Sequence, residues 1–590
     1  MPGNDMKKLL KYITEYKKEC VLGPFFKLLE ACFDLTVPMV MAWMIDRGIS
    51  RQNVPFIWQM GGLLLLLAMV GLTCSITAQY FAAKAAVGFA TKLRHAVFAH
   101  IESLSFTEMD ELGTSMMITR MTSDINQVQS GTNMALRLFL RSPFIVFGAA
   151  IMAFTIDRKA ALVFAVVIPL LALVIFGIML LTMPLYQKVQ GHLDRLLGVT
   201  RQNLSGVRVI RAFNKEQAQK EIYAKENDAL TQMQLFVGKI SALMNPVTYI
   251  MINAALVVLI WTGAVRINLG TLTQGQIVAL INYMSQILIE LIKLANTIIL
   301  TTKCVACGNR IQSLLEMESS ILSENVKTQQ GEYEDQETRG SMPALVEFDD
   351  VTLTYQGAGE PSLEHISFTA KPGQTIGIIG GTGSGKSSLV HLIPRFYDVT
   401  KGEVRINGTN VKNMDLEQLR QSVGIVMQKA VLFHGTIREN IQWGKFDASD
   451  AEINEALELA QAAEFVCQKK EGLDYEIEQG GRNLSGGQRQ RLTIARAVVR
   501  KPEILILDDS ASALDFATDA KLRKALEGLK NTSTIFIVSQ RTSSIQQADQ
   551  IIVLDDGEVA GIGNHEELLN SCEVYQEIYD SQFKKTTQSA

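Results

Sequence analysis

The chain has 590 residues, which is too long for a single hydrophobic core and predicts several domains. Hydrophobic residues make up 47% of the sequence, a high share for a soluble protein, and the formal charge of −4 gives no indication of nucleic acid as a partner. Seven scattered cysteines do not form a disulfide framework. The one close pair, Cys304 and Cys307, supplies only two ligands, so we interpret it as reduced thiols and not as a metal site.

The first 20 residues combine lysines with Leu, Tyr and Ile at helical spacing. This pattern predicts a short amphipathic arm on an anionic membrane surface, with a solvated helical arm as the alternative. We expect no cleavable signal peptide.

Long apolar runs dominate the region 21–312, which we interpret as a membrane domain. A membrane helix needs about 20 mainly apolar residues. Six candidate spans meet this condition, at 21–44, 58–80, 138–156, 160–182, 243–266 and 276–300. Only Ile-Asp-Arg-Lys separates the third span from the fourth, which predicts a tight hairpin. The long connections at 81–137 and 183–242 have a helical pattern and are expected to continue well past the bilayer.

The distribution of Lys and Arg predicts the orientation of the spans. The arm and the two long connections hold 19 of these residues, whereas the three short loops and their borders hold five. Because positive residues concentrate on the cytoplasmic side, the arm, the long connections and the C-terminal half are expected there. A polar, acidic segment at 313–340 is typical of a linker, and 341–590 has the composition of a soluble α/β domain.

The sequence QTIGIIGGTGSGKSSLVHL in this second half contains a phosphate-binding loop. It follows an apolar strand at 375–379 and precedes a helix at 387–393, which is the context such a loop requires. Its backbone N–H groups are expected to surround the phosphates of a nucleotide. Lys386 is expected to contact the β and γ phosphates, and Ser387 to bind Mg²⁺. The predicted loop residues are Gly380, Gly381, Thr382, Gly383, Ser384, Gly385, Lys386, Ser387 and Ser388.

An apolar strand, ILIL, then leads into Asp508, which is expected to lie beside the magnesium ion. Between the two motifs lie Gln428, in GIVMQKAVLF, and the sequence LSGGQ, formed by Leu484, Ser485, Gly486, Gly487 and Gln488. Together with SALD at 512–515, these motifs resemble the nucleotide-binding domain of an ABC transporter. Six spans followed by that domain resemble a type IV ABC exporter half-transporter. The resemblance implies a membrane α-helical bundle of six transmembrane helices, followed by a cytoplasmic α/β P-loop ATPase domain.

The resemblance also implies residue roles, with ATP and Mg²⁺ as cofactors. Tyr355 would stack on adenine, and Ser387, Gln428 and Asp508 would hold Mg²⁺. The LSGGQ residues would contact ATP bound to the opposite subunit, and Asp515 would belong to the D-loop between the two sites. The working unit is therefore expected to be a dimer of two halves.

Two positions depart from the family pattern. Asp509 stands where the family places a glutamate that polarises the attacking water, and its carboxylate reaches roughly 1.5 Å less far. Gln540 stands where the family places a histidine that contacts the γ-phosphate, and glutamine cannot carry a positive charge. Because the phosphate loop and LSGGQ are intact, this pattern predicts a site that binds ATP and hydrolyses it slowly.

This combination resembles one subunit of a bacterial heterodimeric multidrug ABC exporter with one degenerate nucleotide site. The resemblance implies a second half-transporter as partner, a location in the cell membrane and a lipophilic small-molecule substrate. A peptide or lipid exporter driven by the same type of ATPase domain is the alternative, and a non-transporting, ATP-gated regulator or channel subunit is a further one.

The spans contain few ionisable residues. Glu290 lies in the middle of the sixth span, and an ionisable group there is a candidate for substrate contact, for example with cationic drugs. The alternatives are a local ion pair with Lys293, one turn away, or a water-facing cytoplasmic position. Glu30 and Asp34 in the first span are similar cases with weaker support.

Overall fold

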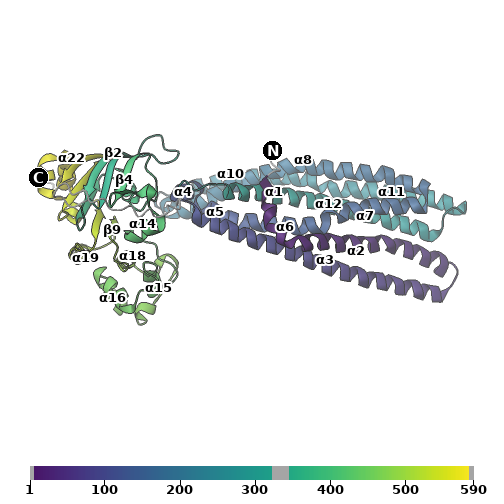
Figure 1. Cartoon of the computed structure of the whole chain (residues 1–590). Coiled ribbons are helices and arrows are strands. Elements are labelled where there is room, and N and C mark those ends of the chain that lie inside the picture. Colours follow the sequence, from purple (N-terminus) through teal and green to yellow (C-terminus); the bar gives the residue numbers. More distant parts are fainter. Residues whose placement is uncertain (1–4, 322–343, 584–590) are drawn as a thin grey trace. The chain divides into compact units, whose positions relative to one another are not determined.

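A computed structural model of the chain describes residues 5–321 and 344–583. The chain divides into two compact units (Figure 1). The helical unit comprises Met1–Glu102 and Gly113–Met317, and the α/β unit comprises Ser103–Leu112 and Glu318–Ala590. The predicted linker at 313–340 lies largely outside the described residues, and its first three residues belong to the last helix of the helical unit.

The helical unit is built from long helices, several of which contain a short π-helical or 3₁₀ segment. Its elements are α1 (Asp5–Leu9), η1 (Leu10–Tyr16), α2 (Lys17–Trp43), η2 (Met44–Ile49), α3 (Val54–Ser103), α5 (Thr114–Thr119), η3 (Arg120–Asp124), α6 (Ile125–Met134), η4 (Ala135–Phe139), α7 (Arg141–Ile156), α8 (Arg158–Ser205), α9 (Val207–Ala212), α10 (Glu216–Ala242), α11 (Met244–Asn268) and α12 (Gln274–Leu315).

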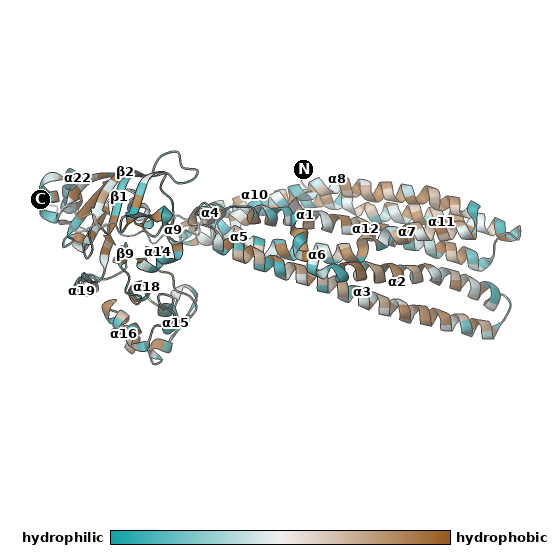
Figure 2. Cartoon of the chain, in the orientation of Figure 1, coloured by the Kyte–Doolittle hydropathy of each residue, from teal (hydrophilic) through white to brown (hydrophobic). Residues whose placement is uncertain are grey.

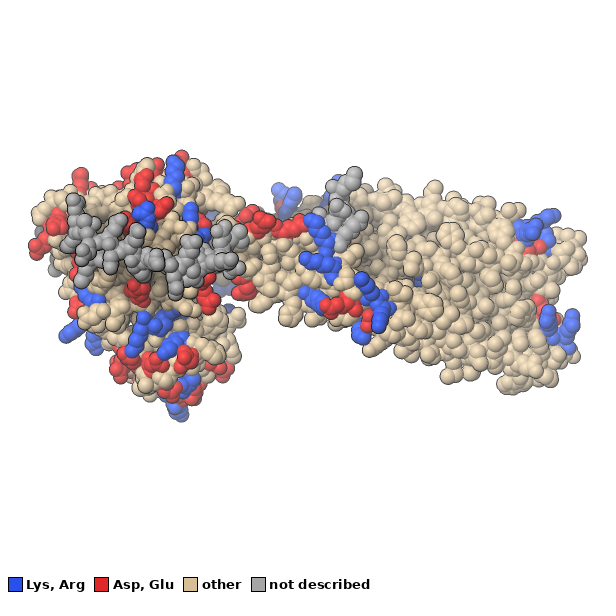
Figure 3. All heavy atoms as spheres, in the orientation of Figure 1, with Lys and Arg blue, Asp and Glu red and all other residues tan. Residues whose placement is uncertain are grey.

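Six helical stretches in the described residues are long and apolar enough to cross a membrane, as predicted. They comprise 10–49, 54–103, 114–156, 158–205, 216–268 and 274–315. Figure 2 shows brown, apolar residues along α2, α3 and α8, and Figure 3 shows a broad tan surface with charged residues near its ends. The 50 residues of α3 correspond to about 75 Å, more than twice a hydrocarbon core of about 30 Å. Long helices therefore continue beyond the bilayer, as the helical pattern of the connections 81–137 and 183–242 predicts.

A capped turn joins α7 to α8. Asp157 accepts a hydrogen bond from the backbone N–H of Ala160 at 2.8 Å, and its other carboxylate oxygen pairs with Arg266 at 2.5 Å. The side chain of Asp157 thus both begins α8 and connects it to the end of α11. This is the tight hairpin that the sequence predicts.

The N-terminal arm is helical and packs on other helices of its unit. Leu9 is fully buried. Met6 packs directly against Gly308 of α12, since a Cβ atom added to Gly308 would lie only 2.2 Å from the Sδ atom of Met6. Glu19 pairs with Lys84 of α3 at 3.0 Å. The contact of the arm with a membrane surface stays a prediction.

Two main sheets and a small two-stranded sheet form the β-structure of the α/β unit. The four-stranded antiparallel sheet has the order β2-β1-β4-β5, the six-stranded sheet has the order β12-β11-β3-β10-β9-β6, and β7 pairs with β8. The strands are β1 (Val346–Leu353), β2 (Leu363–Ala370), β3 (Thr375–Gly380), β4 (Lys401–Ile406), β5 (Thr409–Asn410), β6 (Val423–Val426), β7 (Gly435–Thr436), β8 (Glu476–Ile477), β9 (Ile504–Asp508), β10 (Thr534–Val538), β11 (Gln550–Asp555) and β12 (Glu558–Gly563).

Helices cover the six-stranded sheet, whose interior strands β3 and β9 are buried along their whole length. Continuous burial is expected of parallel strands covered on both faces, and it explains the uninterrupted apolar runs before the motifs. The α-helices of the whole α/β unit are α4 (Phe106–Leu112), α13 (Lys386–His391), α14 (Leu416–Ser422), α15 (Ile437–Gln442), α16 (Asp450–Leu459), α17 (Ala463–Cys467), α18 (Gly486–Val498), α19 (Phe516–Glu527), α20 (Thr542–Ile545), α21 (His565–Ser571) and α22 (Glu573–Phe583).

Candidate nucleotide-binding site

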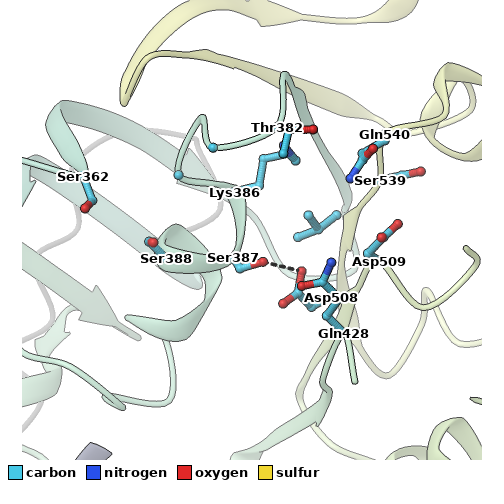
Figure 4. Close-up of a pocket in the computed structure, with 13 residues that line it drawn as sticks. Ser362, Thr382, Lys386, Ser387, Ser388, Gln428, Asp508, Asp509, Ser539 and Gln540 are labelled. Carbon is cyan, nitrogen blue, oxygen red and sulfur yellow. Dashed lines mark hydrogen bonds between the residues drawn. The ribbon is translucent and has the colours of Figure 1, made fainter. Parts of the chain in front are cut away.

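Four parallel strands bring the predicted site residues together. β3, β10, β9 and β6 are neighbours in one sheet, and ligands of such sheets bind at the carboxyl ends of the strands. A cavity of about 280 Å³ lies there (Figure 4). Its lining consists of Ser362, Thr382, Gly383, Gly385, Lys386, Ser387, Ser388, Gln428, Asp508, Asp509, Val538, Ser539 and Gln540.

The loop between β3 and α13 requires glycine at two positions. Gly385 has φ of 89°, and a Cβ on it would lie 2.7 Å from the carbonyl oxygen of Ser362. A Cβ on Gly380 would lie 2.1 Å from the carbonyl oxygen of Leu554. Both positions exclude a side chain, so the backbone can form a tight loop around a phosphate.

Lys386 begins α13 and is largely buried. Its Nζ donates to the carbonyl oxygens of Gly381 at 2.5 Å and Gly380 at 3.1 Å. Burial lowers the pKa of Lys386, although the charges of Asp509 and Asp508 act in the opposite direction. The loop's own carbonyl groups therefore hold the ammonium group inside the cradle that is expected to receive the phosphates.

Oxygen atoms suited to Mg²⁺ meet beside the loop. The Ser387 hydroxyl donates to Asp508 Oδ1 at 2.9 Å, and Asp508 is almost completely buried. The Gln428 side chain points to the same corner of the cavity (Figure 4). Hydroxyl, carboxylate and amide oxygens are the donors that Mg²⁺ prefers, so these residues fit the predicted ion.

Asp509 and Gln540 lie on the side of the cavity opposite the phosphate loop (Figure 4). Asp509 is half-buried and has φ of 46°, and its backbone N–H donates to the carbonyl oxygen of Val538 at 3.0 Å. Burial and the adjacent charge of Asp508 raise the pKa of Asp509. The exposed Gln540 follows β10. The structure therefore places both departures from the family pattern in one cavity.

Tyr355 lies apart from the described lining of this cavity. Its hydroxyl donates to the Ser388 hydroxyl at 2.9 Å, and its ring packs edge-on against Tyr397 at 5.0 Å between centroids. The tyrosine thus contacts the helix that carries the phosphate loop. Its predicted stacking on adenine stays a prediction.

The LSGGQ residues form the start of α18 and are absent from the described lining of the cavity. The Ser485 side chain accepts a hydrogen bond from the N–H of Gln488 at 3.3 Å, while the Gln488 side chain accepts one from the N–H of Ser485 at 3.0 Å. This capping box leaves the N–H groups of Gly486 and Gly487 at the positive end of the helix. Asp515 caps α19 through a single bond, by accepting from the N–H of Thr518 at 3.0 Å.

Besides Val538, three polar residues near the site were not predicted from the sequence. Ser362 and Ser539 line the cavity. His391 lies one turn after Ser387, with its Nε2 at 3.6 Å from Asp508 Oδ2. Ser539 directly follows an apolar strand, a signal that could have identified it. Ser362 has no such signal, because a turn between strands brings it to the loop.

Glu290 lies in the helical unit and is paired within it. Its carboxylate accepts from Arg141 at 2.7 Å, from the Ser142 hydroxyl at 2.9 Å and from Lys293 at 3.0 Å. The predicted ion pair with Lys293 is present, and Arg141 adds a second cation that the sequence did not indicate. A role of Glu290 in substrate contact stays a prediction.

The geometry defines a class of protein, a P-loop nucleotide-binding domain in one chain with six membrane-spanning helices. Comparison with known proteins gives the family. Residues 20–291 match the model of the ABC transporter transmembrane region, and residues 363–512 match that of the ABC transporter. ABC transporter ATP-binding protein Rv1273c of Mycobacterium tuberculosis (strain ATCC 25618 / H37Rv) is 36% identical, over 98% of each chain. YfiB of Bacillus subtilis (strain 168) is 34% identical, over 98% of this chain and 99% of its own.

More distant relatives share the same extent of sequence or fold. The ATP-dependent lipid A-core flippase of Vibrio vulnificus (strain CMCP6) is 28% identical, over 98% of this chain and 97% of its own. The solved structure of a bacterial Atm1-family ABC exporter with ATP bound has a TM-score of 0.78 at 22% identity, covering 97% of this chain and 99% of that one. The chain therefore belongs to the ABC transporters and has the fold of an Atm1-family exporter. It is a multi-pass membrane protein with a cytoplasmic ATPase domain.

Proposed function

We propose that the chain is one half of a heterodimeric ABC exporter, with a nucleotide site that holds ATP and hydrolyses it slowly. The observation that carries the proposal is the presence of Asp509 and Gln540 in one cavity, opposite an intact phosphate loop. Lys386, Ser387 and Asp508 keep the groups that bind phosphate and Mg²⁺. The two positions that differ from the family pattern, Asp509 and Gln540, are those whose usual glutamate and histidine act in hydrolysis.

The physical reason is the limited reach of Asp509. Its backbone is held by the bond to Val538, so the missing methylene draws the carboxylate back by roughly 1.5 Å. A displacement of that size can slow a geometry-limited step about 10²-fold. Gln540 in place of histidine also removes a group that could carry positive charge toward the γ-phosphate.

The intact LSGGQ sequence serves a second site in this proposal. Ser485 and the N–H groups of Gly486 and Gly487 would contact ATP held by the partner's phosphate loop. That site would hydrolyse ATP rapidly. The partner is therefore expected to have glutamate and histidine at the positions of Asp509 and Gln540, and a signature that departs from LSGGQ.

The cargo is proposed to be a lipophilic small molecule moved out of the cell. A peptide or a lipid is the alternative cargo. The lipid is supported by the relative that is named for flipping lipid A-core, at 28% identity.

The test compares the purified chain alone with the chain co-expressed with a partner half-transporter from the same organism. We expect the pair to hydrolyse ATP about 10²-fold faster than the chain alone. Ser485→Ala should reduce the activity of the pair. Rapid hydrolysis by the chain alone, with loss of that activity in Asp509→Asn, would contradict the proposal.

A further inference from the structure

A cluster of six charged side chains connects three helices of the helical unit. We call it the ion cluster, and its members are Lys27, Glu30 and Asp34 of α2, Arg141 of α7, and Glu290 and Lys293 of α12. Arg141 lies at its centre, bonded to Glu290 at 2.7 Å and to Asp34 at 2.8 Å. Lys27 pairs with Glu30 at 2.6 Å. Three carboxylates thus balance three cations within the spans.

The negative charge of Glu290 is directed into this cluster. Only 5% of its side chain is exposed, and Arg141, Ser142 and Lys293 all donate to its two oxygens. A cation from outside would have to displace these donors from a buried carboxylate. Glu290 is therefore poorly placed to attract a cationic substrate directly.

Lys293, by contrast, is 44% exposed. It lies on one face of α12, where four of the seven other partly or fully exposed residues of the predicted span are polar. These seven are Val278, Asn282, Ser285, Gln286, Ile289, Asn296 and Leu300. The exposed face of α7 is mainly apolar, with Phe144, Phe147, Ile151 and Phe154 beside one threonine, Thr155, as expected for contact with lipid. Because polar side chains avoid lipid, the α12 face belongs on a water-accessible path or a polar interface.

The depth of Lys293 is also informative. At about 1.5 Å per residue it lies about 28 Å along α12 from Gln274, close to the thickness of a hydrocarbon core of about 30 Å. Because the C-terminal end of α12 is the cytoplasmic end, Lys293 lies in the cytoplasmic half of the predicted span 276–300, on the side of the headgroups of the cytoplasmic leaflet. An amphiphile entering from that leaflet would bring its head to Lys293 and its chain toward the apolar part of the span.

We propose that Lys293 and the polar face of α12 bind the anionic head of an amphiphilic substrate. The inference rests on the proposed exporter function and specifies its substrate class. The ammonium group of Lys293 can leave Glu290 and bind a ligand, because the Glu290 carboxylate would still be held by its bonds to Arg141 and Ser142. The other partly exposed charge is Asp34, at 42% of its side chain, and its Oδ2 is already held by Arg141.

The test measures binding without ATP, so it does not depend on hydrolysis or on how the halves pair. The full chain, alone and with its partner, is titrated in a neutral detergent with octyl phosphate, octyltrimethylammonium and octyl glucoside, and thermal unfolding reports binding. We expect octyl phosphate to bind best. Lys293→Gln should weaken it about tenfold, the effect of losing one charge-assisted hydrogen bond, and Lys293→Arg should retain it.

Lys303→Gln is the matched control, because Lys303 is an exposed lysine further along α12, and it should leave binding unchanged. Three results would overturn the proposal. The first is equal binding of octyl phosphate to Lys293→Gln and the unmodified chain. The second is preferred binding of octyltrimethylammonium that is lost in Asp34→Asn. The third is loss of pairing with the partner in Lys293→Gln, which would assign the face to the subunit interface.

Discussion

Asp509 is the residue that we propose separates ATP binding from hydrolysis in this chain. It follows the buried Asp508 at the end of β9 and has φ of 46°, a conformation that aspartate tolerates better than most residues. Its N–H bond to Val538 fixes the point from which the side chain extends. The length of the side chain then decides how close the carboxylate comes to an attacking water.

At the residue scale, we predict that Asp509→Asn changes the ATPase rate of the assembled pair by less than about twofold, equivalent to about 0.4 kcal/mol in the barrier. The reason is that rapid hydrolysis is assigned to the other site. Steady-state phosphate release measures this rate. Asp556→Asn is the control, since Asp556 has a similar φ of 43° and lies outside the described lining of the cavity. A tenfold loss in Asp509→Asn alone would show that this carboxylate drives turnover.

At the scale of elements, the serine that caps α18 has a second, proposed role in nucleotide contact. Ser485 caps the helix through its bond with Gln488 and places two glycine N–H groups at the helix start. α16 has the same kind of capping box, formed by Ser449 and Glu452. The two helices thus offer a comparison between capping alone and capping combined with the proposed nucleotide contact.

We predict that Ser485→Ala and Ser449→Ala each destabilise the protein by about 1 kcal/mol through loss of the cap. Only Ser485→Ala should also lower the ATPase rate of the pair. Denaturant unfolding measures the first effect, and phosphate release measures the second. An equal loss of activity in both variants would assign the effect of Ser485 to helix stability.

A second element, α4, belongs to the α/β unit although it lies between segments of the helical unit in the sequence. Phe106 stacks on Phe396 at 4.5 Å between centroids, and Tyr397 donates to Asp110 at 2.7 Å. The buried Glu108 accepts from the Ser105 hydroxyl at 2.5 Å and from the N–H of Ser320 at 3.1 Å. These contacts hold α4 and the segment around Ser320 together.

We predict that α4 is released at acid pH. Burial would raise the pKa of Glu108, but bonds from Ser105 and Ser320 outweigh it, and the pKa lies below its ordinary value of 4.5. The folded state therefore favours the ionised form. The resulting stability is present above the unfolded pKa and is lost as the pH falls through the lowered value. Hydrogen exchange of residues 105–112, corrected for intrinsic rates, should increase over this range.

Glu108→Gln should remove this pH dependence, whereas Glu111→Gln, at an exposed glutamate of the same helix, should keep it. Identical exchange profiles for Glu108→Gln and the unmodified chain would show that another group controls the contact.

At the scale of the whole molecule, the chain combines two units with different cores. The helical unit buries many small residues, such as Ala78, Ala82 and Ala86, between long helices. The α/β unit buries branched residues between helices and a parallel sheet. A ligand of the nucleotide site is expected to stabilise the unit that holds it.

We predict that MgATP at a hundred times its Kd stabilises the α/β unit by about 2.7 kcal/mol. Lys386→Ala should lose most of this effect, because the Nζ atom lies inside the phosphate loop. The exposed Lys371 provides the control variant Lys371→Ala. Thermal unfolding of the full chain with and without MgATP is the measurement. An unchanged ATP effect in Lys386→Ala would contradict the predicted site.

Local sequence was sufficient for the spans, the phosphate loop and the acidic end of β9, whereas the departures at Asp509 and Gln540 were recognised only against the family pattern. The first three features depend on neighbouring residues, because apolar length determines a membrane helix and a strand followed by glycines determines the loop. The approach of Gln428, Asp508 and Gln540 to one another was predicted only through family resemblance. In the structure it follows from the order of β6, β9 and β10 in the sheet.

The tertiary structure alone decided contacts between residues far apart in the sequence. Arg141 and Glu290 are separated by 149 positions, and neither residue indicates the other. Their pairing follows from the packing of α7 against α12, which turned Glu290 from a candidate cation site into a compensated charge. The same holds for α4, whose place in the α/β unit depends on contacts with Phe396, Tyr397 and Ser320. Sequence periodicity shows which face of a helix is buried, but only packing decides what that face contacts.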